Sequence, residues 1–293
     1  AFAGTESGSI FVYEKSASGR LCTSSWTVVP GAAVRVLEWG LNGRVLIAGG
    51  VDCGLSLFDF DDAGQRSLRR RCTIRAPGGE PLVPNAVQAC ELPGDGLRCL
   101  VGTTRGDLVR LDVRHGVEPD IVMAQRTAWH EVRAMARHTK RDSLFAIGAS
   151  DGRLLFHDMQ QRATVQTPTY TCQAPVKCLD WSLSGGFMAC GLGSGQLELV
   201  KTEADWESSK PETALVLELS ILLVTQVSSP PPAGGEPNCL NDVRFSPNEG
   251  GRWLSCGLRD GSIVIFELAD VATSTTFSAL LKHRVLSGHA ASV

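Results

Sequence analysis

The sequence predicts an all-β protein, a β-propeller with six recognisable blades. Two observations carry this prediction: a Gly-x-x-x-Gly unit recurs along the 293 residues, and each unit lies between an apolar stretch and an apolar alternation of period two. Strand-rich units that recur every ~40–50 residues are typical of propeller blades. A β-sandwich with regular hairpins is the alternative, and it does not require so regular a repeat.

The Gly-x-x-x-Gly unit is interpreted as the turn of a β-hairpin, with its second glycine at a positive φ that other residues adopt only under strain. The second glycines are Gly8, Gly54, Gly106, Gly152, Gly195 and Gly261. Their spacings are 46, 52, 46, 43 and 66 residues, so only the last step departs from the length of a blade. Asp151 and Asp260 precede two of these glycines, and we expect them to accept backbone hydrogen bonds within their own turns.

A third strand is predicted shortly before each hairpin, and a looser apolar segment after the hairpin supplies a fourth. The third strand carries apolar residues three and five positions apart. They are Val34/Leu37/Trp39, Val87/Cys90/Leu92, Val176/Leu179/Trp181 and Leu240/Val243/Phe245, with Val132/Met135 as a partial copy. Four strands in each unit are what a propeller blade requires.

The two ends of the chain read as parts of blades. Gly4 has only three residues before it, and residues 284–293 read as an outer strand, a turn at Gly288 and His289, and the opening of a further blade. The ends either complete a shared blade or belong to a longer array. We therefore expect 1–293 to form a single propeller cut from a longer chain, with a seventh blade and a tandem pair of propellers left open.

The 66-residue spacing between Gly195 and Gly261 contains the main insertion, a Pro- and Gly-rich segment at 202–237. It is interpreted as a surface excursion between the fifth and sixth hairpins, because such composition favours extended, flexible chain. A Pro-rich ligand segment is the alternative, although no P-x-x-P with a flanking Arg is present.

Charge and composition argue against several classes of partner. With 28 basic and 31 acidic residues the net charge is −3, whereas nucleic-acid binding normally leaves a basic surplus. No run approaches the ~20 apolar residues of a membrane helix. The ten cysteines are dispersed and never fall as C-x-x-C, which is typical of reduced thiols in a core.

No pattern of catalytic or metal-binding residues stands out, so we expect no enzyme activity and no cofactor. The six histidines are scattered, and no Gly-x-Ser-x-Gly elbow or recurring acid pair appears. Residues 191–195 could pass for a phosphate loop, but no Lys follows and the next element is a predicted strand rather than a helix.

The repeats resemble degenerate WD-type units. Gly288-His289 matches the usual Gly-His, and His289 is interpreted as a structural residue that bonds within its own blade. Phe58-Asp59, Leu111-Asp112 and His157-Asp158 stand where Trp-Asp would.

Three longer segments, 100–105, 187–191 and 285–293, resemble in the same order phrases of the echinoderm microtubule-associated protein-like (EML) family. The resemblance covers nearly the whole chain and corresponds to the C-terminal propeller of that family's tandem atypical propeller domain. The insertion at 202–237 and the lack of an intact Trp-Asp depart from the family pattern.

The resemblance implies a non-catalytic scaffold of the cytoplasm and cytoskeleton, or of the axoneme of a cilium or flagellum, with tubulin, microtubules or axonemal proteins as partners. A WD-repeat adaptor of an unrelated protein complex is the alternative. A propeller hydrolase is a further alternative and would require an acid pair or a metal in the central channel.

One basic segment is a candidate binding site. Arg66, Arg69, Arg70 and Arg71 precede or begin a predicted outer strand, where several arginines could attract the acidic surface of tubulin. The alternative is a solvated strand edge that discourages edge-to-edge aggregation.

Overall fold

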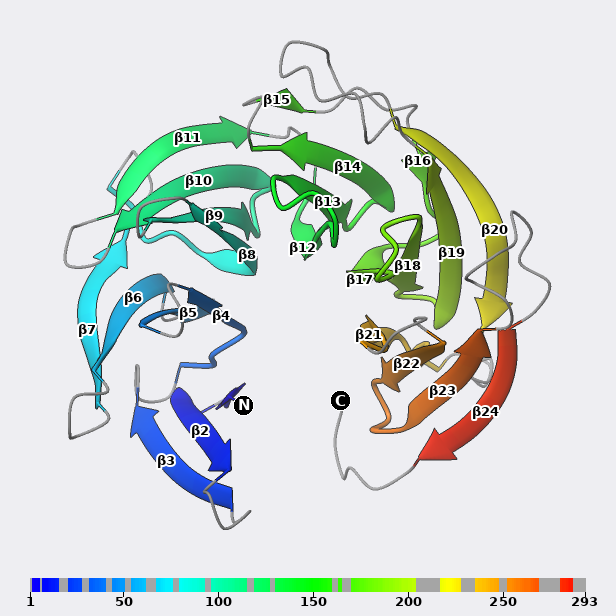
Figure 1. Cartoon of the computed structure of the whole chain (residues 1–293), viewed down its shortest axis with the longest axis horizontal. Coiled ribbons are helices and arrows are strands. Elements are labelled where there is room, and N and C mark those ends of the chain that lie inside the picture. Colours follow the sequence, from blue (N-terminus) through cyan, green and yellow to red (C-terminus); the bar gives the residue numbers. More distant parts are fainter. Residues whose placement is uncertain are drawn as a thin grey trace. The chain divides into compact units, whose positions relative to one another are not determined.

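The computed structural model consists of antiparallel β-sheets, and no helix occurs among the residues it describes (Figure 1). The chain divides into two compact units, Ala1–Val132 and Arg133–Val293. The structure describes residues 2–5, 7–15, 21–27, 32–40, 44–50, 54–61, 67–75, 79–92, 96–114, 119–126, 130–159, 163–164, 170–203, 217–227, 235–247, 252–268 and 280–286.

The first unit contains three sheets. The first sheet has the strand order β1 (Phe2–Gly4), β2 (Ser9–Lys15), β3 (Leu21–Thr27). The second has the order β4 (Val36–Gly40), β5 (Val45–Gly50), β6 (Gly54–Asp61), β7 (Ser67–Ile74). The third consists of β8 (Pro84–Leu92), β9 (Gly96–Thr103), β10 (Asp107–Arg114) and β11 (Asp120–Arg126), again in sequence order.

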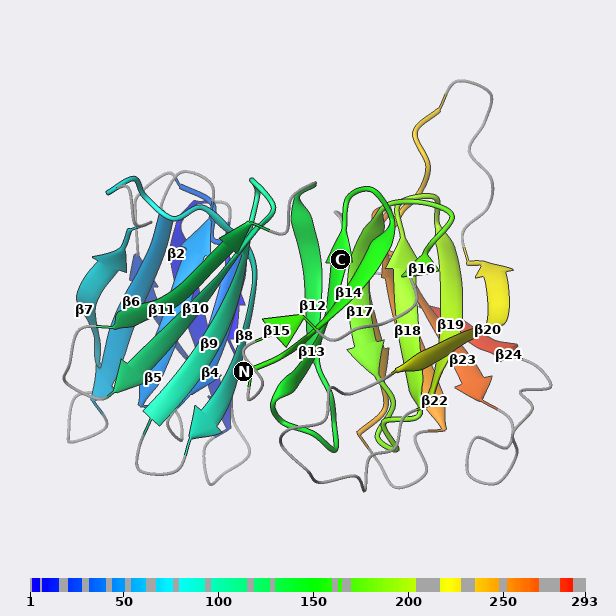
Figure 2. The same ribbon diagram turned by 90° about the horizontal axis from the view of Figure 1, so that it is seen from above.

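Three more sheets follow, beginning at the boundary of the second unit. One consists of β12 (Val132–Arg137), β13 (Leu144–Ala149) and β14 (Arg153–Asp158), with β15 (Ala163–Thr164) and β16 (Tyr170–Thr171) both paired to β14. The next consists of β17 (Val176–Trp181), β18 (Phe187–Leu192), β19 (Gln196–Glu203) and β20 (Glu218–Gln226). The last consists of β21 (Leu240–Phe245), β22 (Trp253–Leu258), β23 (Ile263–Leu268) and β24 (Leu280–Leu286). Figure 2 shows β22, β23 and β24 of this sheet from a second direction.

These sheets confirm the predicted blades. Each Gly-x-x-x-Gly unit joins two antiparallel strands, for example β13 to β14 and β22 to β23. The predicted third strands are β4, β8, β12, β17 and β21, and each occupies one edge of its sheet. The outer strand predicted near the C-terminus is β24, which pairs with β23.

The segment 202–237 differs from the sequence interpretation, because it contains the outer strand β20. This strand pairs with β19 from Gln196↔Gln226 to Glu203↔Glu218. Most of its residues are exposed or only half buried. Because neither face of β20 is fully covered by other residues, its sequence shows no clear alternation of apolar residues. The sequence pattern therefore did not predict this strand. The parts of the segment at 204–216 and 228–234 lie outside the described residues.

The first glycine of the repeated unit has a packing role that the sequence did not reveal. A Cβ added at Gly148 would lie 2.4 Å from Cγ1 of Val176, and one at Gly4 would lie 2.8 Å from Cγ1 of Val34, just before the inner strand β4 of the next sheet. Real Cβ atoms do not approach other atoms so closely. Because Val176 begins the inner strand of the following sheet, the first glycine allows one sheet to pack closely against the next.

The core lies between consecutive sheets. In the first unit, Ile47 and Leu57 of the second sheet belong to one buried cluster with Val101 and Val109 of the third. The second unit has two such clusters, one between its first two sheets and one between its last two. The sheets β4–β7 and β17–β20 therefore bury both of their faces, as packed blades do.

Candidate functional site

The predicted basic segment is only partly described. Arg69 and Arg70 pair with Asp59 and Phe58 of β6, so the segment forms part of the outer strand β7 together with Arg71. Arg66 lies outside the described residues, as does His289. The structure thus brings three of the four arginines onto one strand of one sheet.

The predicted turn residues are all described apart from His289. The second glycines have φ values of 83°, 62°, 81°, 88°, 80° and 84° in chain order. Oδ1 of Asp151 accepts a hydrogen bond from the N–H of Arg153, at 3.1 Å. Oδ1 of Asp260 accepts one from the N–H of Ser262, at 2.9 Å. The hydroxyl and N–H of Ser262 lower the pKa of Asp260.

The described residues contain no group of three or more His, Cys, Asp or Glu side chains that could hold a metal ion. Within the same residues, no helix is long and apolar enough to cross a membrane.

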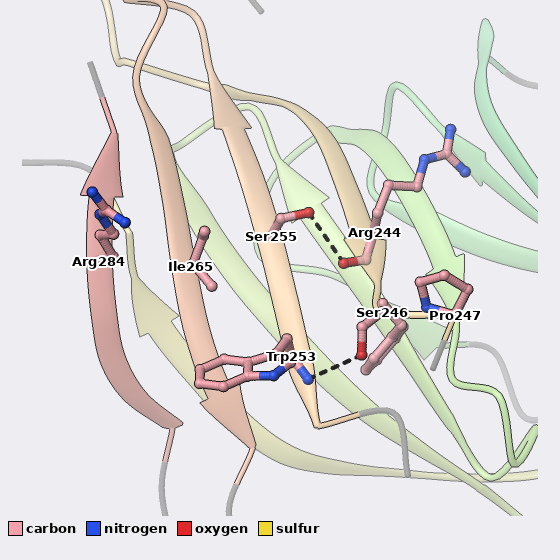
Figure 3. Close-up of a pocket in the computed structure, with 8 residues that line it drawn as sticks. Arg244, Ser246, Pro247, Trp253, Ser255, Ile265 and Arg284 are labelled. Carbon is pink, nitrogen blue, oxygen red and sulfur yellow. Dashed lines mark hydrogen bonds between the residues drawn. The ribbon is translucent and has the colours of Figure 1, made fainter. Parts of the chain in front are cut away.

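A pocket of about 450 Å³ lies on the last sheet, and we call it the arginine pocket. The volume falls within the range of small ligand sites, ~300–1,000 Å³. The lining residues are Arg244, Phe245, Ser246, Pro247, Trp253, Ser255, Ile265 and Arg284 (Figure 3).

Four of these residues form one row across all four strands of the sheet. Arg244 of β21 pairs with Ser255 of β22, Ser255 pairs with Ile265 of β23, and Ile265 pairs with Arg284 of β24. Paired residues lie on the same face of a sheet. Figure 3 shows the two arginines on either side of Ser255 and Ile265. The arginine pocket therefore has a cationic side chain at each end and a less polar middle.

The row lies on the face opposite to the one that the preceding sheet covers. Leu254, Cys256 and Val264 alternate with the row residues and pack in the cluster that includes Ala189 and Leu199 of the sheet β17–β20. Since successive side chains of a strand point to opposite faces, Ser255 and Ile265 point away from that cluster. Both are half buried rather than fully buried.

Arg244 is held in place by two carboxylates. Its Nε lies 3.3 Å from Asp242, and one of its terminal nitrogens lies 3.9 Å from Asp180. Burial opposes the charged form, but the carboxylates of Asp242 and Asp180 outweigh it and raise the pKa of Arg244. The side chain is still 61% exposed, so its guanidinium can reach a ligand.

The hydroxyl groups of the arginine pocket are used in local hydrogen bonds. Ser255 donates to the carbonyl oxygen of Arg244 at 3.3 Å, and the N–H of Trp253 donates to Oγ of Ser246 at 3.2 Å. The guanidinium of Arg252 lies over the Trp253 ring, 5.6 Å from its centroid, and forms an ion pair with Glu267. These bonds fix the rim, and the pocket offers groups for recognition: two guanidinium ions, an indole and an isoleucine.

The inner strands carry a second polar feature that links neighbouring sheets. Oδ2 of Asp180 accepts a hydrogen bond from the N–H of Phe245 at 2.7 Å, and burial raises the pKa of Asp180. In the first unit, Oε1 of Glu38 accepts one from the N–H of Ala89 at 3.0 Å. Each acid stands between the last two apolar residues of its predicted third strand, Leu179/Trp181 and Leu37/Trp39. Arg244 occupies the same position in the last sheet, between Val243 and Phe245.

The arginine pocket was missed by sequence reasoning, because its two arginines lie 40 positions apart in the chain and only strand pairing brings them together. A signal was available in the repeats. Aligning the third strands places Arg244 where Asp180 and Glu38 stand, and this reversal of charge marks the last sheet as different.

The comparisons with known proteins agree with the fold. No family model and no curated protein sequence matches the chain. Among solved structures, the chain is similar to Sqt1 from Chaetomium thermophilum, with a TM-score of 0.64 and 19% sequence identity. The match covers 96% of this chain and 65% of that one. Together with the repeated four-stranded sheets, this likeness shows an all-β, propeller-like fold.

Proposed function

We propose that this chain is a non-catalytic WD-repeat scaffold that binds protein partners through the exposed surfaces of its sheets. The observation that carries the proposal is the arginine pocket, where guanidinium groups of β21 and β24 flank Ile265 on a partly exposed sheet face. Arginine and tryptophan are the residue types that contribute most to protein–protein recognition. The pocket therefore suits a protein partner that combines carboxylates with an apolar side chain.

The partner that we propose is the microtubule, or an axonemal protein in a cilium or flagellum, and the location is the cytoplasm and cytoskeleton. Support comes from the EML-like segments and from Arg69, Arg70 and Arg71, which β7 carries in succession. Tubulin has an acidic surface, and clustered arginines attract such a surface in a salt-dependent way. The chain's net charge of −3 means that a local basic segment must provide this attraction.

Co-sedimentation with microtubules tests this proposal. We expect the chain to pellet with microtubules at low salt and to remain in the supernatant as the salt concentration rises. The triple variant Arg69→Gln, Arg70→Gln, Arg71→Gln should pellet less. A matched control is Arg105→Gln, Arg137→Gln, Arg259→Gln, which removes the same charge from exposed positions of other strands and turns.

The outcomes separate the parts of the proposal. A wild-type chain that does not pellet at any salt concentration would overturn the assignment to microtubules. If both triple variants are folded and pellet equally, only the proposed role of the β7 arginines in microtubule binding is overturned.

A further inference from the structure

We propose that the arginine pocket binds an extended acidic peptide segment of a partner protein. Two carboxylates of the segment pair with Arg244 and Arg284, and an apolar side chain between them packs on Ile265 and Trp253. The inference rests on the proposed role as a protein-binding scaffold, but it does not require that the partner be tubulin.

The row of the arginine pocket differs from the equivalent row of the preceding sheet. Strand pairing there joins Asp180, Ala189, Leu199 and Leu223, in the positions that Arg244, Ser255, Ile265 and Arg284 occupy in the last sheet. Ala189 and Leu199 are 0% and 1% exposed, because the last sheet packs on them. The row in the last sheet is instead polar in three of its four positions and partly exposed. Its composition differs from that of a row covered by an apolar sheet.

The two rows also differ in whether their inner-strand side chain accepts or donates hydrogen bonds. In the preceding sheet, Asp180 accepts the N–H of Phe245 from the sheet that covers it. Arginine has five N–H donors and no acceptor, so Arg244 cannot bind a backbone N–H in this way. Whatever occupies the arginine pocket must bring acceptor groups. Arg284 at the other end of the row imposes the same requirement.

The acceptor that fits the arginine pocket is a carboxylate on a peptide. None of the eight lining residues is acidic; of the described carboxylates nearby, those of Asp242 and Asp180 lie beside Arg244, and that of Glu267 is paired with Arg252. Guanidinium groups bind carboxylates through paired, charge-assisted hydrogen bonds. The apolar middle of the row, with Ile265 and the Trp253 ring, suits an apolar side chain better than a purely ionic ligand.

The spacing of the row determines the spacing of the acids. Four neighbouring strands span three inter-strand distances, which is about 14 Å. An extended peptide rises about 3.3 Å per residue, so acids four positions apart lie about 13 Å from each other. In such a segment residues i, i+2 and i+4 share one side. An acid–x–apolar–x–acid sequence therefore presents two carboxylates and one apolar side chain to the arginine pocket together.

The test uses a fluorescein-labelled peptide, Gly-Ser-Glu-Ala-Leu-Ala-Glu-Ser-Gly, and fluorescence anisotropy with the whole chain. We expect saturable binding that weakens as salt concentration rises. A peptide with Gln in place of both Glu should bind at least about tenfold more weakly, which corresponds to ~1.4 kcal/mol. A peptide with Ser in place of Leu should also bind more weakly, because it has no apolar side chain for Ile265 and Trp253.

Variants of the chain locate the binding site. Arg284→Ala should raise the Kd by about tenfold or more, because it removes one charge-assisted pair. Ile265→Glu should abolish binding by placing a like charge between the two carboxylates. Arg259→Ala is the matched control, since it removes an arginine of the same sheet that lies in the turn between β22 and β23, away from the row. Thermal unfolding of each variant shows that it is folded.

Three results would overturn the inference: no binding of the acidic peptide, equal binding of the Gln peptide, or equal losses from Arg284→Ala and Arg259→Ala. The first is also the result expected if another sheet covers the arginine pocket in solution. Each can occur while the chain still pellets with microtubules, so failure here is distinguishable from failure of the proposed function.

Discussion

The phenol of Tyr170 donates a 2.6 Å hydrogen bond to Oε2 of Glu198, and this bond joins strands of two neighbouring sheets. Glu198 is only 1% exposed. Its other oxygen accepts the N–H of Gln173 at 3.0 Å, so β16 and the residues just after it supply one donor to each carboxylate oxygen. Burial is the main cause of the raised pKa of Tyr170, and the hydrogen bond to Glu198 raises this pKa further. The pair fixes the short strand β16 to β19.

Replacing Tyr170 with Phe should destabilise the protein, because Oε2 of a buried carboxylate loses its donor. We expect a loss of about 1–3 kcal/mol in the free energy of unfolding, measured by urea denaturation. In a Glu198→Gln background the same replacement should cost less, since a neutral amide is less costly to leave unpaired. An unchanged urea midpoint for Tyr170→Phe would contradict the interpretation.

The fold could be predicted from sequence where its causes are local. The turn around Gly152 needs a positive φ, and the neighbouring strands alternate in hydrophobicity, so both signals lie within a few residues. The outer strand β20 could not be predicted in the same way, because its sides are incompletely covered and no alternation is imposed on it.

The candidate site depends on register, which a local pattern does not carry. Arg244 and Arg284 belong to one row only because β22 and β23 lie between them with one particular pairing. A shift of one residue would move each side chain to the other face. The basic segment at Arg69–Arg71 was easier to detect, since its arginines are consecutive in the sequence.

The stability of the second unit should fall as the solution becomes mildly acidic, because His138 is buried in its neutral form. Nδ1 of His138 accepts the N–H groups of Lys140 and Arg141, at 3.2 and 3.0 Å. The proton therefore lies on Nε2, which donates to the carbonyl oxygen of Gly185 at 3.1 Å. Burial lowers the pKa of His138 below its ordinary value of 6.5, and the charges of Arg141 and Lys140 lower it further.

The unfolding free energy should fall as the pH falls, because the unfolded chain takes up a proton that the folded chain does not. Below pH ~6.5 the unfolded chain protonates this histidine while the folded chain does not, so acid favours unfolding until the lower folded pKa is reached. We expect His138→Gln to reduce the difference between the unfolding free energies measured at pH ~7 and pH ~5.5. The exposed His130 is the control, and His130→Gln should keep the wild-type difference. Equal slopes for wild type and His138→Gln would contradict the prediction.

Two cysteines should be unreactive while the protein is folded. Cys99 and Cys190 are 0% exposed, and burial raises the pKa of both thiols well above the ordinary value. The thiolate is the species that alkylating reagents attack, so burial removes both access and reactivity. We expect iodoacetamide to label these residues only after denaturation, as measured by mass spectrometry of peptides. Rapid labelling of either residue in the native chain would contradict the burial of these two thiols.

A last prediction separates backbone strain from steric conflict at the hairpin turn of Gly152. Its φ is 88°, and an added Cβ would lie 2.7 Å from the carbonyl oxygen of Cys172 and 3.1 Å from that of Ala174. Gly79 has a similar φ of 83°, but an added Cβ there would meet nothing within 4 Å. Gly79→Ala should therefore cost only the ~1–2 kcal/mol of a left-handed backbone, measured by thermal or urea unfolding. Gly152→Ala should cost clearly more, because two backbone carbonyls must also move. Equal losses for the two variants would mean that the turn relaxes without disturbing the neighbouring strand.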